Sequence, residues 1–65
     1  MKSIKLLSGA PCSIRMSSVD GFMVANGGFD NLPKKLYNVL VGGKWLTLAD
    51  EAEYDRVRQL AAEAK

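Results

Sequence analysis

The sequence of 65 residues contains no histidine and only one cysteine, Cys12. Histidine is the side chain that normally exchanges a proton near neutral pH, so its absence disfavours acid–base catalysis. One cysteine cannot form an internal disulfide, which excludes the disulfide-stapled class of small secreted domains. It also cannot supply a structural zinc site, which needs four nitrogen or sulfur ligands. We therefore expect neither a metal nor a cofactor.

Long apolar segments are absent as well. No apolar run approaches the roughly 20 residues that a helix needs to cross a bilayer. The segment Met1–Leu7 begins with positive charge but lacks an extended apolar stretch, so it is not expected to act as a signal peptide. These observations predict a soluble, cytoplasmic protein that has no membrane partner.

The chain is too short for a two-domain enzyme, a dinucleotide-binding fold or a long coiled coil. A domain of this size buries only about 60% of the surface that its unfolded chain exposes, so its stability is expected to be marginal. Of its residues, 48% are hydrophobic and 25% are charged. The length leaves a single small domain, or a subunit that is stabilised by a partner.

The charges are distributed unevenly. Residues 1–46 contain six basic and two acidic side chains, whereas residues 47–65 contain three basic and five acidic ones, within a net charge of +2. The two parts therefore present opposite fields to a partner.

Apolar and polar residues alternate through the first three quarters of the chain, which is the pattern of half-buried strands. The expected strands cover residues 2–7, 12–18, 22–26, 36–41 and 44–48. Asp20-Gly21 is a typical turn pair and predicts a hairpin between the second and third of these strands. A three-residue loop, Val19–Gly21, is favoured over a two-residue loop because it places the apolar side chains of both strands on one face. Those side chains are Cys12, Ile14, Met16, Phe22 and Val24.

Gly42-Gly43 predicts a second hairpin, because two glycines accept the positive φ angles of a tight turn. This pairing sets Leu40 opposite Trp45. One face of the hairpin is then apolar and is the expected core face, and the other is half apolar. The core face carries Tyr37, Val39, Val41, Leu46 and Leu48.

From residue 49 the apolar period becomes helical, which predicts a helix over residues 49–63. Thr47 or Asp50 can cap its first turn, and Asp50 with Glu53 has the spacing of a capping box. The apolar stripe consists of Tyr54, Val57, Leu60, Ala61 and Ala64.

Together these elements predict an α+β fold in a single domain, residues 1–65. We expect a small curled antiparallel sheet or partial barrel of about five strands in two hairpins, with one C-terminal helix that covers the sheet or closes one end of it.

No constellation of catalytic residues is evident. Cys12 lies on an apolar strand face without a histidine to activate it, and is expected to be a small buried hydrophobe. The carboxylates between Asp50 and Asp55 splay around a helix and do not converge on a cation. Gly42-Gly43-Lys44 leads into a strand, whereas a phosphate-binding loop leads into a helix. The sequence therefore predicts a protein that is not an enzyme.

Placing the expected core face and helix stripe inside leaves a surplus of apolar residues around Trp45. Exposed apolar patches often mark protein contacts, and tryptophan is enriched at binding hot spots. Alternatively, Leu40 and Trp45 pack under the loop of residues 29–35. The hypothetical partner-binding surface consists of Phe29, Lys34, Lys35, Leu40, Lys44 and Trp45.

The opening decapeptide, Met1 to Ala10, is similar to the start of a small anti-CRISPR protein that combines a sheet with helices. The small size, the N-terminal strand and the charged C-terminal helix also resemble bacteriophage accessory proteins, which include inhibitors of host machinery and small virion components. The remainder of the chain departs from the anti-CRISPR pattern, because it has no matching second helix. The resemblance therefore implies a class of protein and assigns no functional residue.

The sequence thus favours a non-enzymatic protein–protein interaction module, phage-encoded, that inhibits host machinery or joins a larger assembly. Its partner would be another protein or a second copy, in the host cytoplasm or the virion. The alternative is a small barrel that binds single-stranded nucleic acid, because the strand region combines basic and aromatic residues.

Overall fold

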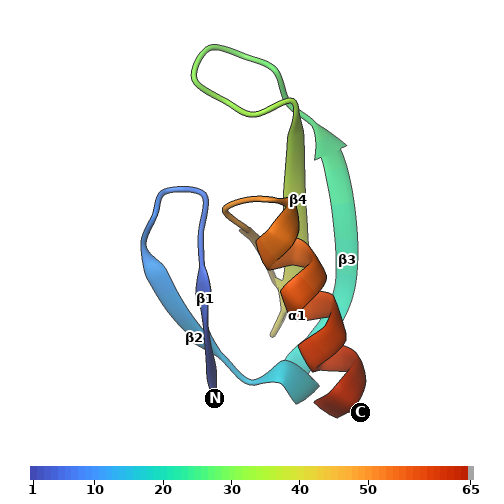
Figure 1. Ribbon diagram of the computed structural model, residues 1–65. Coiled ribbons are helices and arrows are strands. Elements are labelled where there is room, and N and C mark those ends of the chain that lie inside the picture. Colours follow the sequence, from blue (N-terminus) through green and yellow to red (C-terminus); the bar gives the residue numbers. More distant parts are fainter. Residues whose placement is uncertain (65) are drawn as a thin grey trace.

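The computed structural model describes residues 1–64 and shows an α+β fold of two antiparallel sheets and one C-terminal helix (Figure 1). The first sheet pairs β1 with β2, and the second has the strand order β3-β4-β5. Neither sheet closes into a barrel. The elements are β1 (Lys2–Lys5), β2 (Pro11–Ile14), the 3-10 helix η1 (Met16–Ser18), β3 (Val19–Asn26), β4 (Lys35–Val41), β5 (Lys44–Thr47) and α1 (Glu51–Ala64).

The expected hairpin around Asp20-Gly21 is wrong. β2 pairs with β1, with Ile4 opposite Cys12, and β3 pairs with β4. Asp20 and Gly21 lie inside β3, where the register shifts as in a β-bulge. The reason is the turn of η1, in which the Ser18 amide donates to the Arg15 carbonyl at 2.9 Å. This turn ends β2 and redirects the chain, so that β3 joins a different sheet.

The hairpin around Gly42-Gly43 is confirmed. Both glycines have positive φ angles, of 57° and 80°, which the tight primed turn requires. Leu40 lies opposite Trp45 as expected. The expected core face is confirmed as well: its members are buried or half-buried, and Val39 has no exposed surface.

The two sheets meet where β1 and β5 end. Leu6 forms an isolated antiparallel bridge with Leu48. The Leu7 amide donates to the Thr47 carbonyl at 3.0 Å, and the Ala49 amide donates to the Lys5 carbonyl at 3.0 Å. These bonds place β1 beside β5, so that the two sheets together curl around one side of α1.

The core lies between the sheets and α1, which crosses the three-stranded sheet with the β1–β2 hairpin beside it (Figure 1). Three aromatic rings pack together beside the first turn of α1, with the Tyr54 ring centroid 5.6 Å from that of Phe22 and 5.1 Å from that of Tyr37. Every element except β5 contributes at least one buried apolar residue, and Leu48 directly follows β5. The buried apolar residues are Ile4, Ile14, Met16, Val19, Val39, Leu48, Val57 and Ala61.

Helix α1 begins at Glu51, two residues later than expected, because Asp50 is its cap. The Asp50 carboxylate accepts a hydrogen bond from the Glu53 amide at 2.8 Å. In a complete capping box the Glu53 side chain would also bind the backbone amide of Asp50, but here it binds β1. Glu53 accepts a hydrogen bond from the Lys5 amide of β1 at 2.8 Å and pairs with Arg56, which donates to the Ser3 carbonyl at 2.8 Å. The first turn of the helix is thereby fastened to β1.

Candidate partner-binding surface

The outer face of the three-stranded sheet, opposite α1, carries a row of three residues near the Gly42-Gly43 turn. Gly21 of β3 lies opposite Leu40 of β4, which lies opposite Trp45 of β5. The tip of the indole, Cη2, lies 3.9 Å from where a Cβ on Gly21 would stand, and the Leu40 Cβ lies 3.8 Å from the same point. The indole therefore extends over Leu40 toward a position that has no side chain.

Trp45 keeps 49% of its surface exposed in this arrangement, and Met23, two residues along β3 from Gly21 on the same face, keeps 45%. We call this surface of Gly21, Met23, Leu40 and Trp45 the tryptophan face. Exposure of this extent shows that the loop of residues 29–35 does not bury Trp45, so the structure favours the exposed-patch interpretation over the packed one.

A hydrogen-bonded pair borders the tryptophan face. Asn38 is 8% exposed, and its side-chain oxygen accepts a hydrogen bond from the Thr47 hydroxyl at 2.7 Å. Its amide nitrogen donates to the Leu36 carbonyl at 3.4 Å. These bonds satisfy a polar side chain in the middle of a sheet face, and they hold β4 and β5 in register beneath Trp45.

The six residues of the hypothetical surface divide between the two ends of the sheet. Leu40 and Trp45 lie together near the Gly42-Gly43 turn, whereas Lys44, opposite Val41, lies at the same end but on the other face of the sheet. Lys35 lies five residues from Leu40 along β4, or roughly 16 Å at the usual strand rise, and Lys34 and Phe29 lie beyond it. The structure thus brings two of the six residues, Leu40 and Trp45, together on one face and separates the other four from them.

Phe29 belongs to the loop between β3 and β4, at the end of the molecule farthest from the termini (Figure 1). It is 73% exposed. The loop is internally bonded, because the Gly28 amide donates to the Pro33 carbonyl at 2.9 Å and the Leu32 amide donates to the Phe29 carbonyl at 2.9 Å. Phe29 is therefore a separate apolar projection and not part of the tryptophan face.

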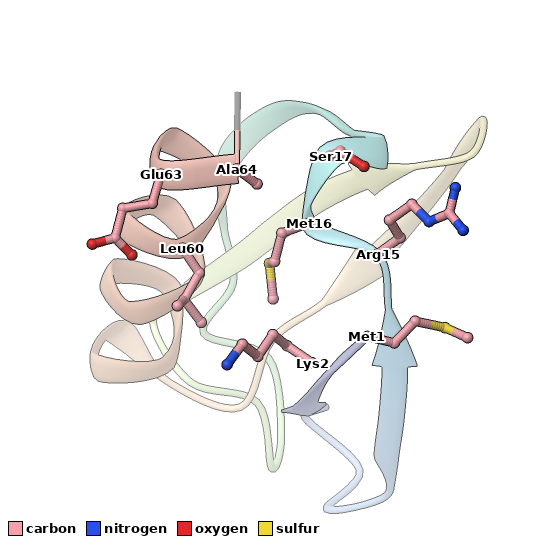
Figure 2. Close-up of a pocket in the computed structure, with 8 residues that line it drawn as sticks. All are labelled: Met1, Lys2, Arg15, Met16, Ser17, Leu60, Glu63 and Ala64. Atoms are coloured by element: carbon pink, nitrogen blue, oxygen red, sulfur yellow. The ribbon is translucent and has the colours of Figure 1, made fainter.

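A depression of about 460 Å³ lies between the start of β1, η1 and the end of α1. Met16 and Leu60 point into its centre, whereas the Glu63 carboxylate and the Arg15 guanidinium lie at opposite sides (Figure 2). Among the described residues, the charged side chains that line this depression form no ion pair with one another and no cluster that could hold a metal ion. The sequence did not predict this depression, because its lining residues come from three segments that are far apart in the chain.

The pKa values of Tyr37 and Glu53 are shifted by neighbouring groups, but these two residues do not form a catalytic pair. Burial raises the pKa of Tyr37, and Glu51, 3.4 Å from its hydroxyl, adds to the increase. The hydrogen bond from Arg56 holds the pKa of Glu53 below its ordinary value of 4.5. Glu51, Glu53 and Arg56 lie near the N-terminal end of α1, so both pKa shifts follow from the attachment of this helix to the sheets.

Cys12 is half-buried and packs against the core as a small hydrophobe. Among residues 1–64, no three His, Cys, Asp or Glu side chains gather closely enough to hold a metal ion. No helix in the same range has the length and apolar character to cross a bilayer.

Comparisons of the chain with protein-family models, with curated protein sequences and with solved structures found no match.

Proposed function

We propose that the chain is a non-enzymatic protein-binding module that contacts its partner through the tryptophan face. The observation that carries the proposal is the exposure of 49% of Trp45 on the outer face of the sheet, with Leu40 opposite it on β4. A large aromatic ring that is already held in place loses little conformational freedom on binding, which makes it an efficient anchor.

The surface indicates the chemistry of the partner. An apolar recess of the partner would receive the indole and Met23, which are 49% and 45% exposed on this face. Association through such a surface fits an inhibitor that occupies a functional site of a host protein. Such a surface equally fits a small component that lies between larger subunits. The proposal therefore includes a phage origin and both roles, inhibitor and assembly component.

The test is affinity capture from a host extract with three forms of the chain. Wild-type protein should retain a partner that Trp45→Ala loses, while Phe29→Ala retains it, because Phe29 is more exposed but lies away from the tryptophan face. Circular dichroism should show that all three forms fold. Loss of the folded spectrum in Trp45→Ala would mean that Trp45 stabilises the fold, and equal loss of capture in Phe29→Ala would contradict the proposed surface.

Single-stranded nucleic acid is the competing ligand, because an exposed indole can stack on a base. Such binding should be detectable at low salt and should weaken steeply as salt is added. Trp45 is the only tryptophan of the chain, so titration of its fluorescence with an unstructured oligonucleotide distinguishes the two ligands. A saturable, salt-sensitive change in emission would replace the protein-binding proposal.

A further inference from the structure

The sheets expose four strand edges, and they differ in how each is protected. An unpaired edge presents free amides and carbonyls that can pair with another chain, and proteins normally cover, shorten or interrupt such edges. The edge of β1 that faces away from β2 is covered, because Arg56 binds the Ser3 carbonyl and Glu53 binds the Lys5 amide. Side chains of α1 therefore take the place of a neighbouring strand.

Two other edges are short or interrupted. β2 has four residues and begins with Pro11, which has no amide hydrogen to donate. β5 also has four residues, begins with Lys44, and has its Thr47 carbonyl bonded to Leu7. Neither edge offers a long row of free backbone groups.

The edge of β3 lacks these protections over Phe22–Asn26, because its register shift lies earlier, between Val19 and Gly21. It has eight residues, Val19–Asn26, contains no lysine or proline, and forms the outermost strand on its side of the molecule (Figure 1). Within residues 1–64, β4 is its only sheet neighbour. Its exposed apolar side chains lie on both faces, with Met23 and Val24 each 45% exposed.

The hydrogen-bonding pattern identifies the backbone groups that point outward. The Gly27 amide donates to the Lys34 carbonyl, and the Leu48 amide donates to the Tyr37 carbonyl. Because antiparallel pairs alternate, Met23 and Ala25 bond to β4. Phe22, Val24 and Asn26 therefore direct their amides and carbonyls away from the sheet.

We propose that a second copy of this chain pairs antiparallel with the free edge of β3, joining the two three-stranded sheets into one. The edge is complementary to itself when Met23 lies opposite Met23 of the second copy. Phe22 then pairs with Val24 of the second copy, and the two such pairs exchange about four backbone hydrogen bonds. The exposed Val24 extends the aromatic group of Phe22, Tyr37 and Tyr54 across the junction.

Charge favours the same register. Asp20, the only charged residue of β3, lies opposite Asn26 of the second copy, whose neighbour on β4 is Lys35. The carboxylate and the ammonium group then belong to strands roughly 10 Å apart, a distance that the aspartate and lysine side chains span together. The two-fold axis repeats this pair at the other end, which favours a second copy over an unrelated strand.

The wild-type protein provides the first test, through amide hydrogen exchange measured by NMR at about 10 µM and about 1 mM, because dimer formation follows mass action. The amides of Phe22, Val24 and Asn26 should gain at least tenfold protection at the higher concentration, while those of Met23 and Ala25 stay unchanged. Protection that does not alternate, or a monomer at about 1 mM in sedimentation equilibrium, would overturn the proposal.

A matched pair of variants provides the second test. Val24→Lys places a charge on the edge, and Leu32→Lys places the same charge on a loop residue of similar exposure, 40% against 45%. Val24→Lys should weaken self-association at least tenfold, whereas Leu32→Lys should leave it unchanged. Equal weakening by both would show a non-specific effect of charge and would contradict pairing through β3.

Discussion

Glu53 and Arg56 supply β1 with the hydrogen bonds that a neighbouring strand would otherwise give. They lie on the first two turns of α1, yet their partners, Lys5 and Ser3, are about fifty positions away in the chain. Because the side chain of Glu53 is only 12% exposed, solvent screens this ion pair less than an ordinary surface pair. Two residues of α1 therefore reinforce the position of the N-terminal strand, which also pairs with β2 and bonds to β5.

This attachment should depend on pH. The Arg56 hydrogen bond lowers the pKa of Glu53 in the folded protein below its ordinary 4.5. A depressed pKa contributes stability above the unfolded value, and that stability is lost as the pH falls through the folded-state pKa. Urea denaturation should show a larger fall in unfolding free energy between about pH 6 and about pH 3 for wild type than for Glu53→Gln. Parallel curves would show that Glu53 is not coupled to folding.

Two glycines of β3 and its loop should differ in how much stability an added methyl group costs. A Cβ on Gly27 would lie 2.2 Å from the Pro33 carbonyl oxygen, whereas a Cβ on Gly21 meets nothing closer than 3.8 Å. Gly27→Ala should lower the free energy of unfolding by about 1–3 kcal/mol through this overlap, and Gly21→Ala by less than about 1 kcal/mol. Chemical denaturation of the two variants tests this, and equal losses would contradict the geometry.

At the scale of elements, α1 and the β4–β5 hairpin could be predicted because their signals are local. Asp50 caps the helix that follows it directly, and Gly42-Gly43 joins strands that are neighbours in sequence. The β3 pairing could not be predicted in the same way. Gly21 has the sequence of a turn, but it serves the packing of Trp45, which is 24 positions away.

The cap of α1 should have a measurable effect on the whole domain. Asp50→Ala removes the acceptor for the Glu53 amide, and such a loss costs about 1 kcal/mol. Asp55→Ala removes the same charge from an exposed helix position and serves as the control, with a smaller expected loss. Thermal denaturation of both variants should place Asp50→Ala lower in Tm, and the reverse order would be inconsistent with capping.

At the scale of the whole molecule, apolar surface remains exposed after the core is complete. The sequence predicted a surplus around Trp45, and the structure places it on the sheet face opposite α1. The sequence could not predict that Phe29, Lys34 and Lys35 lie at the other end of the sheet from Trp45. That separation depends on β4 being extended over seven residues, and on β3, not β2, being its partner.

The tryptophan face and the free edge of β3 are distinct features that share one sheet. The edge uses backbone groups of Phe22, Val24 and Asn26, and the face uses the side chains of Met23, Leu40 and Trp45, so that only Met23 lies at both. Pairing through β3 would leave Trp45 uncovered, because Trp45 belongs to the strand farthest from that edge. A dimer would therefore present two tryptophan faces and would bind a bivalent partner more tightly than one copy does.

The most direct test of the central claim is fluorine NMR of a chain labelled with fluorotryptophan, which gives one resonance because Trp45 is the only tryptophan. The partner captured from the host is added to saturation. We expect the resonance to shift and to lose its sensitivity to the exchange of light for heavy water, as the indole leaves solvent. An unchanged resonance in the saturated complex would show that the partner binds elsewhere and would contradict the role of the tryptophan face.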